Sequence, residues 1–219
     1  MPRGFLNQGI LDLESKIAQM GEYVERAVKL AIEALRTLDV DLADDVITMD
    51  EVIDSSRLEI EANCLKLLAT QQPVARDLRI IMSSFSIATD LERIGDHAHD
   101  IANIVLRHQS MPLLKPLIDI PRMTDVAMGM LRDALKALVE EDEALARELC
   151  ERDHIVDGLY NQVFRELLVF MMSDPKTITR ATHLIMAAQH VERIADLATN
   201  IAERAIYIAT GHYAELNAD

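Results

Sequence analysis

Apolar residues recur every three or four positions along almost the whole chain, a spacing that places them on one face of an α-helix. Between residues 78 and 105 the stripe consists of Leu78, Ile81, Phe85, Ala88, Leu91, Ile94, Ala98, Ile101 and Val105. Such a stripe packs against those of neighbouring, nearly antiparallel helices. The chain has only seven Gly and no Trp, whereas a β-sandwich or barrel needs turn glycines and strand-forming residues. The sequence therefore predicts an all-α fold.

Prolines divide this pattern into separate helices. Pro73 and Pro175 each interrupt a helix pair, and Pro112, Pro116 and Pro121 exclude a continuous helix through the central stretch. Asp39 or Asp41 is the expected N-cap of the second helix, and Asp142 that of the fifth. We expect six long helices, over residues 5–37, 42–71, 75–109, 121–139, 142–172 and 176–211.

The two halves of the chain resemble each other. Residues 31–38 match 131–138, and 90–102 match 190–202, both at an offset of 100 residues. Between them, residues 50–54 match 153–157 at an offset of 103. Matches in the same order indicate a tandem duplication. We predict duplicated three-helix bundles, with the first over residues 1–110, a Pro-containing linker over 111–121 and the second over 122–219.

Charge and cysteine content exclude several functions. The chain carries 22 Lys and Arg against 37 Asp and Glu, a net charge of −15, which disfavours nucleic acid and anionic lipid as partners. Cys64 and Cys150 lack metal-finger spacing, so we expect reduced, buried thiols. We find no secretory signal, no stretch apolar enough for membrane insertion, no Gly-rich phosphate loop and no catalytic series. We therefore expect an intracellular protein that is not an enzyme.

Carboxylates one helical turn apart are the sequence feature that most indicates a chemical function. They lie in the matched segments of both halves, on faces turned away from the apolar stripe. Like charges at this spacing destabilise a helix slightly, yet the pattern recurs, so metal binding competes about evenly with a merely solvated acidic face. Oxygen ligands suit Mg²⁺, Mn²⁺, Ca²⁺ or iron. The residues of this pattern are Asp50, Asp54, Glu92, Asp96 and Asp100 in the first half and Asp153, Asp157, Glu192, Asp196 and Asn200 in the second.

Several basic residues accompany these carboxylates. His99 follows Asp96 by three residues and could reach a metal on that face, although a surface histidine is the simpler interpretation. Arg93 and Arg193 occupy matched positions. They either hold the carboxylates in place or form ordinary intrahelical ion pairs.

The segments LERIGDHAHDIANI (91–104) and VERIADLATNIAERAIY (191–207) resemble the repeated signature of the PhoU family of phosphate-signalling regulators. DEVID (50–54) and DHIVD (153–157) resemble the other acidic motif of that family. The resemblance implies a duplicated three-helix bundle. It also implies metal ions, iron or zinc, with the ten residues above as ligands. Asn200 stands in the second half where the first half has Asp100. Because an amide is a neutral ligand, the resemblance implies a weaker or smaller metal site in the second half.

By the same resemblance, the protein is expected to be a cytoplasmic adaptor, peripheral to the inner face of the membrane through protein partners. It would negatively regulate phosphate uptake and the phosphate-starvation response. Its expected partners are the ATPase of a high-affinity phosphate ABC transporter, a membrane sensor histidine kinase and a second copy of the chain in a homodimer. Two alternatives remain: an accessory protein of a low-affinity phosphate permease, and a metal-buffering helical protein.

Overall fold

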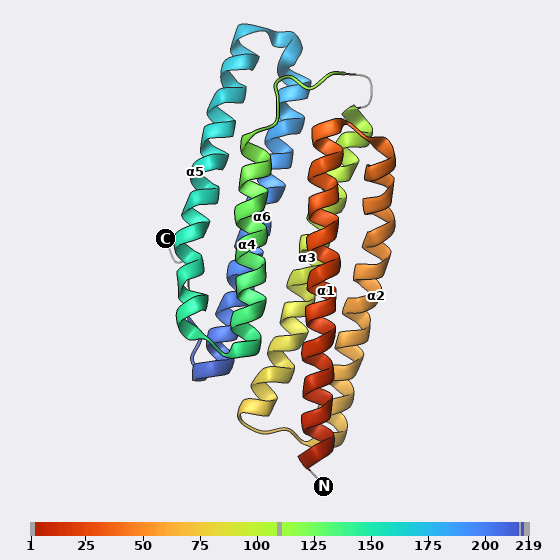
Figure 1. Ribbon diagram of the computed structural model, residues 1–219, viewed down its shortest axis with the longest axis vertical. Helices are drawn as coiled ribbons and strands as arrows, with labels where there is room; N and C mark the ends of the chain where they lie inside the picture. Colours follow the sequence, from red (N-terminus) through yellow and green to blue (C-terminus); the bar gives the residue numbers. More distant parts are fainter. Residues whose placement is uncertain (1–2, 109–110, 215, 217–219) are drawn as a thin grey trace.

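The computed structural model describes residues 3–108, 111–214 and 216, and within them the chain is helical throughout its regular structure (Figure 1). The all-α prediction is confirmed. None of the described helices contains a stretch that is long and apolar enough to cross a bilayer. The elements are α1 (Arg3–Thr37), α2 (Val40–Gln71), α3 (Arg76–His108), α4 (Asp119–Glu140), α5 (Glu143–Ser173), the short 3₁₀ helix η1 (Pro175–Thr177) and α6 (Ile178–Thr210).

Capping explains where two of the helices begin. The Asp39 side chain accepts hydrogen bonds from the backbone N–H groups of Asp41 and Leu42, so Asp39 and not Asp41 caps α2. Asp142 accepts from the N–H of Leu145 and caps α5, as predicted. The predicted start of α4 at residue 121 was two residues late. Pro121 lies in the first turn, where a backbone N–H has no intrahelical acceptor to lose.

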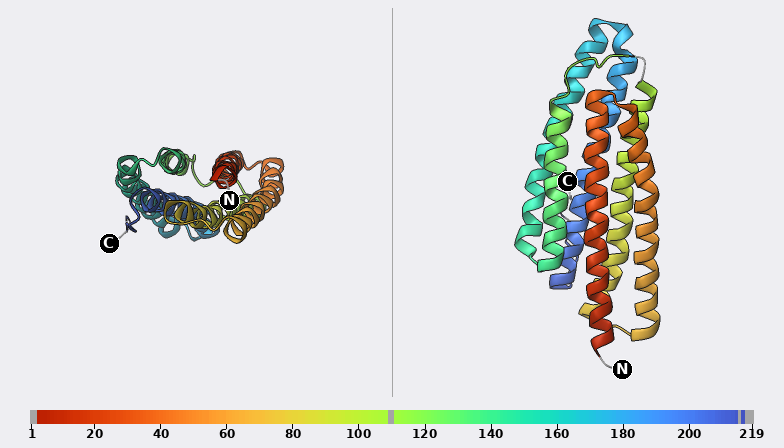
Figure 2. Two further views of the ribbon diagram at one scale, coloured as in Figure 1. Left: turned by 90° about the horizontal axis from the view of Figure 1, so that it is seen from below. Right: turned by 45° about the vertical axis from the view of Figure 1, so that its right-hand side comes forward.

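The helices form two three-helix bundles that pack side by side. Helices α1–α3 contact one another, as do α4–α6, and the bundles meet mainly through α3 and α6, with a smaller contact between α1 and α4. Figures 1 and 2 show α1 and α4 on one side of the molecule, and α3 and α6 at the centre of the other, flanked by α2 and α5. Helices α3 and α6 run antiparallel (Figure 1), and Arg79 near the start of α3 donates to the carbonyl oxygen of Ile208 near the end of α6 at 3.1 Å.

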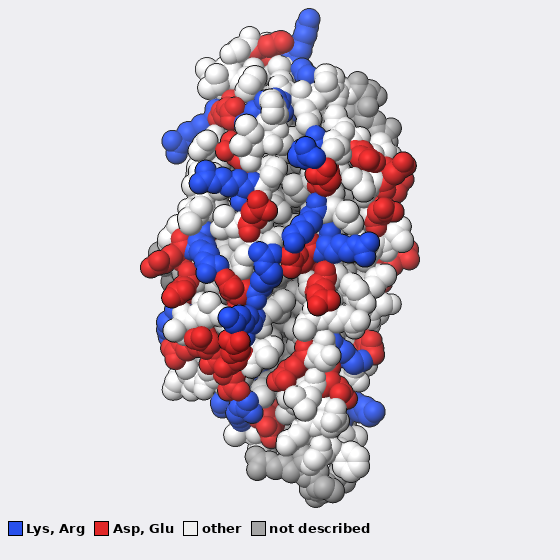
Figure 3. Space-filling model, viewed as in Figure 1, with Lys and Arg blue, Asp and Glu red and all other residues white. Residues whose placement is uncertain are grey.

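Ion pairs reinforce the contact between the bundles on the α1–α4 side. Arg132 of α4 donates to Glu25 of α1 at 2.6 Å, and Arg76 pairs with Glu141. Figure 3 shows this face, where basic side chains lie among acidic ones along the middle of the molecule. Pairs of opposite charge therefore join the two bundles on this side.

The connection between the bundles is also anchored. Leu113, Leu114 and Leu117 pack against the core, and Lys115 pairs with Glu166 of α5. The predicted boundaries at residues 110, 111–121 and 122 remain a prediction.

The apolar stripe of α3 forms the centre of the core, and we expect its truncation to be costly. Leu91 is fully buried, whereas Leu65 on α2 is 60% exposed. Leu91→Ala should destabilise the protein by about 2–5 kcal/mol, because it removes buried methyl groups and leaves a cavity. Leu65→Ala should change stability by less than about 0.5 kcal/mol. Urea unfolding of both variants measures this difference, and equal losses would contradict the placement of α3 in the core.

Candidate functional site

Helices α2 and α3 bring four of the predicted ligands together. Asp50 and Asp54 of α2 lie close enough to Glu92 and Asp96 of α3 that, after burial, carboxylate repulsion contributes to raising the pKa of both α3 residues. Gly95 permits this approach, because a Cβ there would lie 3.1 Å from the Ile53 side chain. We call Asp50, Asp54, Glu92 and Asp96 the first patch.

Two cationic or ionisable side chains contact the first patch. His99 Nδ1 lies 2.8 Å from Asp50 Oδ2, so His99 is a patch neighbour and not an isolated surface histidine. Arg57 Nε lies 3.5 Å from Glu92 Oε1, and Arg57 also pairs with Glu61. Sequence analysis missed Arg57, whose only signal was its position three residues after Asp54 on the same helix. These contacts leave Asp50 Oδ1 buried without a hydrogen-bond partner.

The second patch is the equivalent cluster between α5 and α6: Asp153, Asp157, Glu192 and Asp196. Burial, followed by repulsion from Asp196 and Asp157, raises the pKa of Glu192 to about 7. Burial, followed by repulsion from Asp157 and Asp196, raises the pKa of Asp153 to about 6. The expectation that these carboxylates line an outward face was wrong for Asp153, which is buried. Tyr160 stands where the first half has Arg57, so the second patch lacks that contact; Arg193 instead opposes the rise in the pKa of Glu192 and of Asp196.

Asp100 and Asn200 lie at the edge of the patches, at the contact between α3 and α6, which we call the seam. Each step of four residues rotates a side chain by about 40° around its helix. The series from position 92 to 100 therefore turns from α2 towards α6, and the series from 192 to 200 turns equivalently. Asp100 Oδ2 lies 3.8 Å from His190 Nδ1 across the seam.

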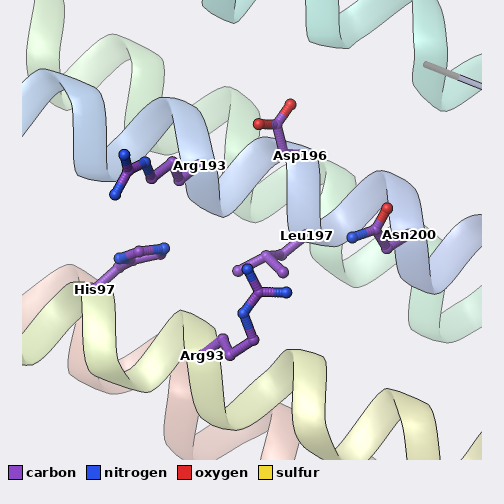
Figure 4. Close-up of a pocket in the computed structure, with 6 residues that line it drawn as sticks. All are labelled: Arg93, His97, Arg193, Asp196, Leu197 and Asn200. Carbon is purple, nitrogen blue, oxygen red and sulfur yellow. The ribbon is translucent and has the colours of Figure 1, made fainter. Parts of the chain in front are cut away.

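The seam carries a groove of about 460 Å³, lined by Arg93, His97, Arg193, Asp196, Leu197 and Asn200 (Figure 4). His97 Nδ1 lies 3.2 Å from His190 Nδ1. Burial, followed by His190 and Arg193, lowers the pKa of His97 to about 4. Arg93 lies 3.7 Å from Asp90, three residues earlier, which is an intrahelical ion pair and not a clamp on the first patch.

The two patches fit a cation. Carboxylates with raised pKa values and a buried oxygen without a partner are stabilised when a positive ion approaches. All-oxygen ligands suit hard cations and iron. In the described part of the chain, three potential ligand atoms lie within 4.8 Å of one another only in the group His97, Asp100 and His190. The ten-residue ligand set remains a prediction.

The cysteine prediction holds where it can be checked. Cys64 is buried and free, and burial raises the pKa of its thiol to about 12, so it stays protonated and unreactive. The side chain of Cys150 lies outside the described residues.

The raised pKa of Glu192 predicts how stability depends on pH. Between the ordinary value of 4.5 and about 7, the folded chain binds a proton at Glu192 that the unfolded chain has released, so this contribution to stability falls as pH rises. In metal-free buffer, Glu192→Gln should be near neutral at pH 4.5 and stabilising by on the order of 1 kcal/mol at pH 7.5. Urea unfolding at both pH values measures this. A gain of equal size at both would contradict the placement of Glu192 among carboxylates.

Known proteins with the same fold and similar sequence place the chain in a family. A family model described as the PhoU domain matches residues 17–105 and again residues 120–205. A PhoU homologue from Aquifex aeolicus, a phosphate-specific transport system accessory protein, is 40% identical over 91% of this chain and 90% of its own. A protein of the same description from Clostridium acetobutylicum is 37% identical over 99% of this chain and 100% of its own.

Solved structures agree. The crystal structure of PhoU from Pseudomonas aeruginosa superposes with a TM-score of 0.89 at 35% identity, covering 94% of this chain and 99% of that one. PhoU from Streptococcus pneumoniae, a phosphate transport system regulatory protein, gives a TM-score of 0.88 at 30% identity and covers 96% and 99%. Full-length similarity in sequence and in structure shows that the chain belongs to the PhoU family.

Proposed function

We propose that this protein is an accessory regulator of a phosphate-specific transport system that restrains phosphate uptake and the starvation response when phosphate is plentiful. The observation that carries the proposal is the full-length similarity to proteins described as accessory to that system. In this role the protein passes the state of a phosphate ABC transporter to a membrane sensor histidine kinase. It acts in the cytoplasm and reaches the membrane through these partners.

The acidity of the surface supports docking on proteins. A net charge of −15 steers association towards basic protein faces and away from anionic lipid. We expect the ATPase of the transporter and the kinase to present such faces. A second copy of the chain, in a homodimer, is a further expected partner.

We propose that the two patches bind metal ions, with iron or zinc as the expected ions and Mn²⁺ or Mg²⁺ as further candidates. Asp50, Asp54, Glu92 and Asp96 would hold metal between α2 and α3, and Asp153, Asp157, Glu192 and Asp196 between α5 and α6. A bound divalent cation would offset part of the negative charge of each patch. The packing of the two helices in each pair sets the spacing of their carboxylates. His99 Nδ1 lies 2.8 Å from Asp50 Oδ2 and orients that carboxylate.

Loss of the gene tests the regulatory role. In a strain that lacks it, a phosphate-repressed phosphatase reporter should be expressed in abundant phosphate at the level of starved cells, because the transporter state no longer reaches the kinase. Restoring the gene should restore repression. Normal repression in the deletion strain would refute the adaptor role. The permease-accessory and metal-buffering alternatives would then take precedence.

Asn200 implied a weaker or smaller second site, but Asn200 is not part of the second patch, and we expect this patch to bind metal more tightly than the first. Arg57 Nε lies 3.5 Å from Glu92 Oε1 and competes with metal for that carboxylate, whereas Tyr160 offers no charge at the equivalent position. Arg193 opposes the rise in the pKa of Glu192 only as the fourth-largest of the causes that act on it. In equilibrium dialysis with Fe²⁺ or Zn²⁺ near half-saturation, Asp153→Asn/Glu192→Gln should lose more bound metal than Glu92→Gln/Asp96→Asn.

Asp44→Asn/Asp45→Asn is the matched control, because it removes two exposed acidic charges of α2 that lie outside both patches. The control should retain the metal content of the unmodified chain. Equal losses in all three variants would show that metal follows overall charge and would contradict specific patches.

A further inference from the structure

We propose that His97, His190 and Asp100 form a third metal site, at the seam between the bundles, that takes a transition-metal ion such as Zn²⁺. The site differs from the two patches in position and in ligand chemistry. It joins α3 of one bundle to α6 of the other, whereas each patch lies within one bundle.

The spacing of the three side chains fits a metal ion. Ligands about 2.0–2.1 Å from a tetrahedral Zn²⁺ stand about 3.3 Å from one another. The two Nδ1 atoms of His97 and His190 are 3.2 Å apart, and Asp100 Oδ2 is 3.8 Å from His190 Nδ1. One ligand atom from each residue lies within 4.8 Å of the other two. Small side-chain rotations would therefore complete the coordination without moving the helices.

The ligand types select the ion. Two imidazole nitrogens and one carboxylate oxygen suit Zn²⁺, Fe²⁺, Co²⁺ or Ni²⁺, whereas Mg²⁺ and Ca²⁺ prefer oxygen alone. The patches, which consist only of carboxylates, lack this preference. The seam should therefore bind Zn²⁺ in the presence of excess Mg²⁺.

The surroundings of the proposed seam site let a metal ion enter, and acidic side chains there partly balance the charge of the nearby arginines. His97 borders the open groove, into which it and the nearby Arg93 point (Figure 4). Arg93 and Arg193 oppose a cation, but Asp96 beside Asp100 and Asp196 in the groove offset them. Three protein ligands leave a coordination position open to water or an anion.

The internal repeat shows that the cluster is specific to one end of the seam. At the offset of 100 residues, the equivalents of His97, Asp100 and His190 are Leu197, Asn200 and Asp90. That trio contains a single ionisable ligand, and Asp90 instead lies 3.7 Å from Arg93. The duplicated architecture alone therefore does not produce the site.

The direct test uses the full chain, stripped of metal by a chelator and labelled with ¹⁵N at histidine. One equivalent of Zn²⁺ is added in excess Mg²⁺, and the imidazole nitrogens are recorded by NMR. The Nδ1 resonances of both His97 and His190 should shift together. Unshifted resonances for either ring would overturn the proposal, and this readout needs no variant to fold.

Variants then measure the affinity by calorimetric titration with Zn²⁺ in the same buffer. His97→Ala, His190→Ala and Asp100→Asn should each weaken one Zn²⁺ site at least about tenfold, with helix content checked by circular dichroism. His212→Ala, a change at an exposed histidine near the end of the chain, is the matched control and should leave that site intact. Unchanged affinity in both histidine variants would show that Zn²⁺ binds only the patches and would overturn the proposal.

Discussion

The packing of α3 against α6 is the contact on which the rest of the molecule depends. Each three-helix bundle buries its own apolar stripes, but it is this antiparallel seam that sets one bundle against the other. Leu197 of α6, which lines the groove between the two helices, is itself buried. The seam also determines which faces of α3 and α6 remain free, and the carboxylates of both patches lie beside it.

The patches show how one fold gives two sites of different character. Duplication places four carboxylates in each bundle, and burial raises pKa values in both. Their neighbours differ, with Arg57 and His99 in the first half and Tyr160 and Thr199 at the equivalent positions of the second. The charge left uncompensated therefore differs, although the helices that carry the ligands are equivalent.

Much of the fold could be predicted from the sequence, because helical periodicity, prolines and caps such as Asp142 act locally. The four carboxylates of each patch could also be anticipated, since residues four apart share a helix face. What could not be predicted is lateral placement: Asp100 faces His190 because of how α3 crosses α6, and periodicity within one helix does not encode that crossing. Burial of Asp153 and the contact of Arg57 with Glu92 likewise depend on how the helices of each bundle pack against one another.

The antiparallel seam has a consequence for how a duplicated chain can diverge. Across the seam, residues from different positions of the two repeats meet. Figure 4 shows His97 of α3 beside Arg193 of α6, and Arg93 of α3 beside Leu197 of α6. In the same way His97 contacts His190, whereas the repeat equivalents of these two residues are Leu197 and Asp90. A single substitution in one copy therefore changes one end of the seam and leaves the equivalent end as it was, so the two ends are free to acquire different chemistry.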